Sequence, residues 1–132
     1  MNEKLYIHNK EQRIPAAGVA FSNRFMSQSL QQQISHCDHY ELVGIFKKWL
    51  PDFQPILEAG SGSGRWVAWF LKKGWRAIGL DWSEACCLRA TSEIPGACFD
   101  VGDMRDMPYN NGEFGSIVSL GSIEHTPEGP NK

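Results

Sequence analysis

The sequence predicts an α/β protein, with a doubly wound, Rossmann-like parallel sheet and an N-terminal helical cover. Three observations predict this fold class. Short apolar runs alternate with helical periodicity after Pro51, three glycines fall within residues 60–64, and Asp81 ends the next apolar run. Strands that alternate with helices form parallel sheets with helices on their faces. The 132 residues suffice for one domain with its own core.

The first 50 residues are predicted to form the cover, and residues 51–132 the sheet domain. Residues 1 to about 35 are polar and irregular, with a glutamine-rich stretch, "SQSLQQQ". From His39 to Pro51 apolar residues recur at helical spacing, namely Leu42, Ile45, Phe46, Trp49 and Leu50. We therefore expect an amphipathic helix there, with this apolar stripe covering the rest of the protein.

Four strands are expected after Pro51, in the runs "PILEA", "RAIGLD", "GACFDV" and "FGSIVSLGS". The segment "GRWVAWFLKK" has the composition of a helix, which Gly74 ends. Ser83 is the expected N-cap of a second helix, "SEACCLRATS". The segment "PYNNGEF" has the residues of a turn before the fourth strand.

Composition and charge argue against several classes of protein. A net charge of −2 offers no basic surface for nucleic acid. No run approaches the ~18 apolar residues of a membrane span, and the N-terminus lacks the apolar core of a signal peptide. Four cysteines without a C-x-x-C pair fit a reducing cytoplasm, so we expect a cytoplasmic protein with neither nucleic acid nor membrane as partner.

The segment "EAGSGSGR", residues 58–65, has the glycine spacing of a ligand-binding turn. A P-loop would need lysine after its last glycine, where Arg65 stands. A dinucleotide fingerprint needs G-x-G-x-x-G/A, which neither Gly60 nor Gly62 begins. The pattern is instead E-x-G-x-G-x-G, so a phosphate-binding or nicotinamide-binding turn is disfavoured.

Carboxylates around this turn indicate a different ligand. Glu58 precedes the turn, Asp81 ends the second strand and Asp103 follows the third. These groups would repel a pyrophosphate but suit a ligand with ribose hydroxyls, an adenine amino group, an ammonium and a sulfonium. The helix N-terminus at Gly64 can receive one carboxylate. Together these groups describe S-adenosylmethionine. A metal site is not predicted, because the histidines of "SHCDHY" lack zinc-ligand spacing.

Residues 56–128 resemble class I S-adenosylmethionine-dependent methyltransferases, in particular the small-molecule group known as methyltransferase type 11. Four segments match the family's motifs in order: "LEAGSGSGR", "GLDWS", "VGDMRDMPYNNGEF" and "IVSLGSIEHTPE". The resemblance implies S-adenosylmethionine as cofactor and methyl transfer to an acceptor, which we expect to be a small molecule. It also implies that the chain holds the first four strands of the fold. Gly115 departs from the family, which usually has an acidic residue there.

The resemblance also implies roles for single positions. Asp81 would clamp the ribose and Trp82 would lie along the adenine, whose amino group Asp103 would contact beside the backbone N–H of Met104. Glu58 would hold the ammonium. The rest of the methionine end would lie against Gly60, Ser61, Gly62, Ser119 and Leu120. Capping, strand-end and turn-forming roles stay open for the three acids.

The catalytic residue is unknown, and His125 is the obvious acid–base candidate near the cofactor. Methyl transfer needs positioning more than covalent help, so the lack of a triad is no objection. One alternative is a truncated cofactor-binding fragment without activity, because the sequence stops at Lys132, just after the fourth strand. A nicotinamide-dependent oxidoreductase is a third, weaker hypothesis. An apolar fourth strand at an open edge further predicts self-association.

Overall fold

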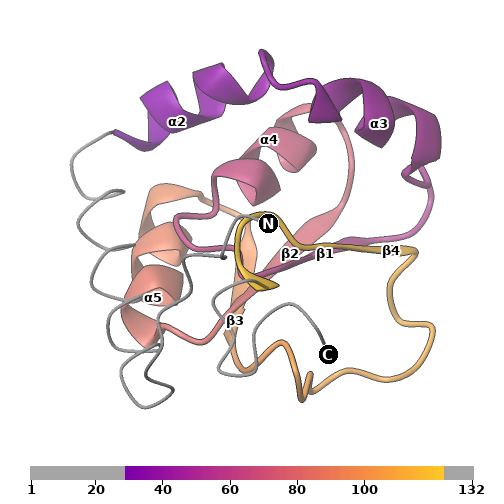
Figure 1. Ribbon diagram of the computed structural model, residues 1–132. Coiled ribbons are helices and arrows are strands. Elements are labelled where there is room, and N and C mark those ends of the chain that lie inside the picture. Colours follow the sequence, from indigo (N-terminus) through magenta and orange to yellow (C-terminus); the bar gives the residue numbers. More distant parts are fainter. Residues whose placement is uncertain (1–28, 124–132) are drawn as a thin grey trace, which may run out of the picture.

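The computed structural model of the chain describes residues 29–123 (Figure 1). Its strands are β1 (Ile56–Ala59), β2 (Ala77–Asp81), β3 (Cys98–Val101) and β4 (Ser116–Val118). They form one four-stranded sheet in the order β3-β2-β1-β4, and every neighbouring pair is parallel. The predicted Rossmann-like parallel sheet is confirmed.

The strand order places a switch point beside β1. From β1 the chain builds β2 and β3 on one side, and it then crosses to the other side of β1 to form β4. Ile56 of β1 is opposite Ala77 of β2 and also opposite Ser116 of β4. In open parallel sheets, ligands bind outside the carboxyl ends of the strands at such a point. The loop after β1 is therefore where a ligand is expected.

Two helices, α4 (Arg65–Lys72) and α5 (Glu84–Glu93), pack on one face of the sheet. Ile56, Ala77 and Val118 point to this face and share a core with the aromatic side chains of α4. Ala90 of α5 and Ile94, which follows the helix, belong to the same core. Both helices thus hold the strands together from the same side.

The ends of α4 and α5 follow the sequence prediction. Ser83 is the N-cap of α5, and its hydroxyl accepts a hydrogen bond from the Cys86 N–H at 3.3 Å. Gly74 follows α4 with a φ of 96°, which is the left-handed conformation that ends many helices. Local capping chemistry therefore fixes the start of α5 and the end of α4.

The described part of the glutamine-rich stretch is helical from Leu30 onward, so the prediction of irregular structure up to residue 35 is wrong there. Helix α2 runs over Leu30–Cys37 and begins with a capping box, in which Ser29 and Gln32 each bond to the other's backbone N–H. Leu30, Ile34 and Cys37 are buried on one side of α2. In Figure 1, α4 lies between the sheet and the two helices of the cover.

The second helix of the cover, α3 (Leu42–Trp49), is amphipathic as predicted, but its buried side is narrower than the predicted stripe. Phe46 is 5% exposed and packs edge-on against Trp66 and Phe70 of α4. Ile45 is 53% exposed and Trp49 is 70% exposed. The apolar stripe is thus wider than the surface of α4 that it meets.

Aromatic side chains form most of the contact between the cover and the domain. Trp66 and Trp69 are almost fully buried, and their rings meet edge-on at 5.5 Å. Trp69 also stacks on Trp75 at 6.0 Å. Helix α4 is covered on one side by the sheet and on the other by α2 and α3, which explains why it is apolar on nearly all sides. The division into residues 1–50 and 51–132 stays a prediction.

Gly115 has a structural reason for its departure from the family pattern. Its N–H donates to the carbonyl of Pro55 at 3.0 Å, so two backbone segments approach closely. A Cβ at Gly115 would lie 2.6 Å from the Pro51 Cγ and 2.6 Å from the Gln54 Cβ. An acidic side chain does not fit at this position in this chain.

Among the described residues, no helix is long and apolar enough to cross a bilayer.

Candidate functional site

The loop between β1 and α4 is built on left-handed glycines. Gly60, Gly62 and Gly64 have φ values of 82°, 52° and 75°. Side chains with a Cβ are strained in this region, so glycine is needed at each of these positions. A Cβ at Gly64 would also lie 2.5 Å from the Phe99 ring. The glycine spacing noticed in the sequence is thus a backbone requirement of this turn.

Backbone hydrogen bonds fix the first half of this glycine loop to β2. The N–H groups of Gly60 and Ser61 both donate to the carbonyl of Leu80, at 2.7 and 3.0 Å. These bonds continue the β1–β2 ladder past the end of β1. The loop therefore leaves the extended conformation at Gly60 but stays bonded to the end of β2 through Ser61.

Asp81 joins the glycine loop to the turn between β2 and α5. Its carboxylate accepts from the Gly62 N–H at 2.8 Å and from the Ser83 N–H at 2.9 Å. Burial raises the pKa of Asp81, and these two hydrogen bonds oppose that shift. Each carboxylate oxygen has more than one acceptor site, so capacity for further donors remains. Asp81 has the position predicted for a ribose clamp and also holds two loops together.

Glu58 lies beneath the loop, as predicted, and is 2% exposed. Its carboxylate accepts from the Val67 N–H in the first turn of α4 at 3.2 Å. The N-cap position of α4 is Gly64, which has no side chain, so Glu58 supplies the cap from β1. Burial raises the pKa of Glu58 to about 8, against the lowering effects of the Val67 N–H and of Arg65.

The segments after β3 and β4 meet the glycine loop at Gly60. The Ser122 hydroxyl donates to the Gly60 carbonyl at 3.1 Å. A Cβ at Gly60 would lie 2.2 Å from the Ser122 Oγ and 3.0 Å from the Met104 Cε. The structure thus brings the predicted residues Gly60 and Met104 together. Ser122 was missed, although it lies inside the fourth matching motif of the sequence.

Asp103 differs from the other two acids because it is paired locally. Its carboxylate forms a salt bridge with the Arg105 guanidinium and also accepts from the Arg105 N–H at 2.9 Å. These contacts hold the pKa of Asp103 below its usual range. The side chain is 42% exposed. An adenine amino group that bonds to Asp103 would share it with Arg105.

The remaining predicted residues lie around the same edge of the sheet. Trp82 directly follows β2 and is 50% exposed, so its ring is free to form a platform for a ligand. Ser119 is exposed just after β4, while Leu120 packs partly against the core. His125 lies outside the described residues. All of these described positions follow the carboxyl ends of strands.

The donor and acceptor groups at the carboxyl ends of the strands fit the chemistry predicted for the ligand. The Ser61 Oγ is buried and has no hydrogen-bond partner within the described part of the chain. Asp81 and Glu58 are acceptors when ionised, and a ligand with hydroxyl and ammonium groups supplies donors. No group of three or more possible metal ligands occurs in residues 29–123. Asp38 of "SHCDHY" bonds instead to Trp69 and Lys73.

A parallel sheet of this order with a glycine-rich turn at the switch point is shared by dinucleotide-binding domains and by class I S-adenosylmethionine-dependent methyltransferases, and comparison with known proteins assigns the chain to the second class. Residues 56–131 match the family described as "Methyltransferase domain", and the chain belongs to this family. An uncharacterized methyltransferase of Synechocystis sp. (strain ATCC 27184 / PCC 6803 / Kazusa) is 31% identical over 75 residues, which are 56% of this chain and 35% of that protein. The resemblance found in the sequence is confirmed.

Solved structures show the same fold. A TehB-like SAM-dependent methyltransferase from Corynebacterium glutamicum is 24% identical with a TM-score of 0.58, over 81% of this chain and 56% of that one. The glycopeptide N-methyltransferase MtfA, complexed with sinefungin, is 27% identical with a TM-score of 0.54, over 64% of this chain and 40% of that one. The chain thus spans about a third of the curated relative and about half of the first structure.

Proposed function

We propose that this chain binds S-adenosylmethionine at the glycine loop and takes part in methyl transfer to a small-molecule acceptor. The observation that carries the proposal is the glycine loop itself. Its left-handed turn is held at the switch point by Asp81, whose carboxylate bonds to the Gly62 N–H at 2.8 Å. The family membership of the chain and the MtfA complex with S-adenosylhomocysteine support this assignment.

In this proposal each acid receives a different part of the cofactor. Asp81 accepts from the ribose hydroxyls while it keeps its two backbone donors. Trp82, half exposed beside it, covers the adenine, and Asp103 accepts from the adenine amino group. Glu58 is buried beneath the loop and sets the position of α4; a nearby ammonium would favour its ionised form, and only in that form does Glu58 attract the ammonium. The bound cofactor supplies an electrophilic methyl group.

The remaining predicted contacts belong to the methionine end of the cofactor. Gly60 is required here, because Ser122 and Met104 fill the space that its Cβ would occupy, and its backbone lies against the methionine end in this proposal. Ser61 and Gly62 continue that surface, and Ser119 and Leu120 border it from the end of β4. These groups orient the cofactor and exclude water, which is the main protein contribution to an in-line displacement.

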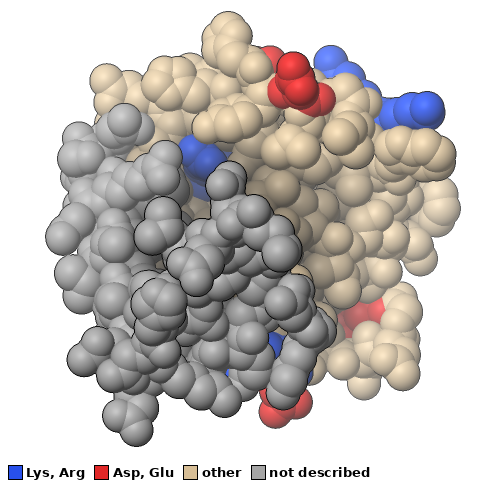
Figure 2. Space-filling model, in the orientation of Figure 1, with Lys and Arg blue, Asp and Glu red and all other residues tan. Residues whose placement is uncertain are grey.

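The proposed acceptor is a small molecule, and the proposed location of the protein is the cytoplasm. The net charge of −2 gives little attraction for nucleic acid. On the face drawn in Figure 2, the described Lys and Arg side chains lie in separate places, with two close together at the upper right, and they form no continuous basic patch on that face. MtfA, by its name, methylates a glycopeptide, which is consistent with an acceptor outside the nucleic acids.

Thermal unfolding with and without S-adenosylhomocysteine tests the cofactor assignment. A ligand that binds only the folded state stabilises it by about 2.7 kcal/mol at a hundredfold excess over Kd, so the melting temperature should rise. NAD is the matched control and should cause no shift. If NAD stabilises the chain and S-adenosylhomocysteine at millimolar concentration does not, the oxidoreductase hypothesis replaces this one.

Turnover separates the enzyme from the inactive fragment. A chain that binds S-adenosylhomocysteine and methylates a member of an acceptor panel is the enzyme. Binding without turnover on any acceptor favours the cofactor-binding fragment. Because the chain spans only part of its relatives, the panel should also be run with a chain of their full length, if the gene encodes one.

We also propose that the isolated chain self-associates through β4. Within residues 29–123, β4 pairs only with β1 and stands at the edge of the sheet. Ile117 in its centre is 55% exposed. Apolar strands at open edges pair with other chains. Sedimentation over a range of concentrations checks this, and a monomer that is insensitive to concentration would contradict it.

A further inference from the structure

A buried polar contact connects the helical cover to the glycine loop. Gln33 of α2 is 1% exposed, and its Oε1 accepts from the Ser63 hydroxyl at 2.7 Å. Ser63 is itself only 9% exposed, so both side chains are largely shielded from water. A buried glutamine is costly unless its polar atoms are bonded, which makes this contact specific.

Ser63 occupies the half of the loop that β2 does not hold. Gly60, Ser61 and Gly62 are bonded to the end of β2, through Leu80 and Asp81. Ser63 follows them and stands between two left-handed glycines, where the chain turns into α4. Its side chain reaches α2, which lies on the outer side of α4. The loop is therefore held from the sheet on one side and from the cover on the other.

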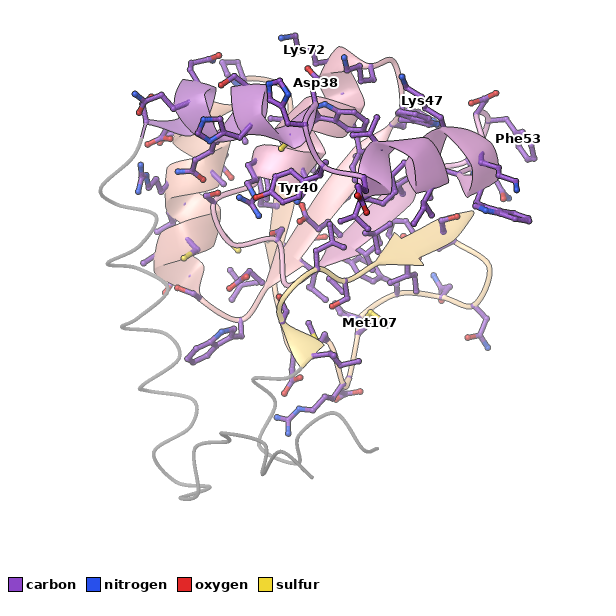
Figure 3. All side chains as sticks on the ribbon, turned by 45° about the horizontal axis from the view of Figure 1, so that its top comes forward. Asp38, Tyr40, Lys47, Phe53, Lys72 and Met107 are labelled. Atoms are coloured by element: carbon purple, nitrogen blue, oxygen red, sulfur yellow. The ribbon has the colours of Figure 1, made fainter. Side chains whose placement is uncertain are left out.

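Helix α2 is a firm anchor for this contact. Asp38, at its end, accepts from the Trp69 Nε1 at 3.0 Å and forms a salt bridge with Lys73 at 2.8 Å. Figure 3 shows Asp38 at the end of α2, near the helix that carries Lys72. Leu30 and Ile34 are buried on either side of Gln33 in sequence. Gln33 is thus fixed relative to α4 by contacts before and after it.

We propose that Gln33 is a positioning residue of the glycine loop, which makes α2 part of the cofactor site. Gln33 acts through Ser63 on the backbone at Gly62 and Gly64. Its effect on ligand affinity rests on the proposed function, whereas its effect on the loop does not. The cover therefore does two things: it buries apolar surface of α4, and it sets the shape of the glycine loop that the ligand contacts.

Gln33→Ala is the direct test, and Gln31→Ala is its matched control. Gln31 is exposed on the same helix, so the control makes the same chemical change without touching the loop. Hydrogen exchange of the amides of residues 60–67 is measured first, without any ligand. We expect exchange at least several-fold faster in Gln33→Ala than in Gln31→Ala, while the amides of β2 and β3 stay at the wild-type rate.

Affinity for S-adenosylhomocysteine is measured next by calorimetry, at a temperature where all variants are folded. Losing a buried hydrogen bond that shapes the loop should weaken binding about tenfold in Gln33→Ala. Gln31→Ala should stay within about twofold. Ser63→Ala removes the other partner, and the double variant should be no weaker than either single one, because both remove the same contact.

The outcomes separate the two proposals. If wild-type protein binds no S-adenosylhomocysteine, the proposed function fails, but hydrogen exchange still decides whether Gln33 positions the loop. Unchanged exchange and unchanged affinity in Gln33→Ala would overturn the inference. Should Gln33→Ala fail to fold, Ser63→Ala, which removes a single hydroxyl, carries the same two measurements.

Discussion

The ends of β2 and β3 are adjacent on the same edge of the sheet, yet their acids are held in opposite ways. Asp81 is 7% exposed, and its carboxylate joins the Gly62 and Ser83 backbone across two loops. Asp103 has a 42% exposed carboxylate that bonds to Arg105, two residues away. One acid is a structural part of the loop system, and the other belongs to a local turn.

This difference explains how the carboxyl ends of the strands combine a rigid, hydrogen-bonded part with a part that a ligand can reach from water. The side at Asp81 and the glycine loop is closed by hydrogen bonds that exist before any ligand arrives, so a ligand meets a preformed surface. At Asp103 a ligand has to compete with Arg105, but it can reach the carboxylate from water.

Gly64→Ala should remove the most stability. A Cβ there would be strained by the φ of 75° and would lie 2.5 Å from the Phe99 ring. Conformational strain and overpacking together should lower the free energy of unfolding by about 4 kcal/mol. Gly112→Ala is the control, because Gly112 has a φ of 80° but nothing within 4 Å of its Cβ position. Urea unfolding should show a loss of only about 1 kcal/mol for the control, because only the strain of the left-handed backbone remains.

Glu58→Gln should change how stability depends on pH. The folded state holds the pKa of Glu58 at about 8, well above the ordinary value of 4.5, so it keeps a proton that the unfolded chain releases. This contribution is complete below pH 4.5 and is lost as the pH rises toward 8. Relative to Glu58→Gln, wild type should lose on the order of 3 kcal/mol between about pH 5 and 7.5.

Denaturant titrations of both proteins across that pH range measure the Glu58 effect. The glutamine keeps an oxygen that accepts from the Val67 N–H, so the cap on α4 is retained. Parallel pH profiles for the two proteins would show that Glu58 is ionised in the folded state, contrary to its burial.

Asp81→Ala should lower both stability and ligand affinity. Two backbone N–H groups lose a charged acceptor, and removal of a buried carboxylate offsets part of that loss, so about 2 kcal/mol of unfolding free energy should disappear. Affinity for S-adenosylhomocysteine should fall at least tenfold, since the proposed acceptor of the ribose hydroxyls is lost as well. Calorimetry and urea unfolding on one preparation test this. Unchanged affinity with reduced stability would assign Asp81 to the loops alone.

Asp103→Ala should show the smallest effect on stability. Its salt bridge with Arg105 is exposed, and such pairs contribute between about 0 and 1 kcal/mol. Affinity for S-adenosylhomocysteine should still fall several-fold, because the proposed acceptor of the adenine amino group is gone. Equal losses of stability at Asp81 and Asp103 would contradict the contrast between the two strand ends.

The parts predicted well from the sequence are those fixed by local chemistry. Glycine spacing located the turn, because left-handed backbone at Gly60 and Gly62 has few other solutions. Ser83 and Gly74 marked helix ends for the same reason. The acid at the end of β2 was placed correctly as well, since parallel strands bring their carboxyl ends to one edge. What Asp81 binds there remains a prediction.

The parts predicted poorly depend on distant contacts. The sequence of α2 contains a capping box and apolar residues at helical spacing, but the run of glutamines between them made the segment look polar and irregular. Gln33 is buried because Ser63 faces it, and that partner is thirty positions away. Whether Ile45 and Trp49 are buried depends on the width of α4, which no local period encodes.

The tryptophans give this fold an optical signature. Trp66 and Trp69 are sealed in the core beside the glycine loop, and Trp75 stacks on Trp69 with an interplanar angle of 26°. Trp82 is half exposed next to the predicted adenine position. Emission from the chain therefore combines a blue-shifted, ring-coupled component with a red-shifted one, from Trp82 and from the exposed Trp49, that iodide can quench. In a Trp49→Phe variant, protection of the red component with the blue one unchanged would report a ligand near Trp82 without any label.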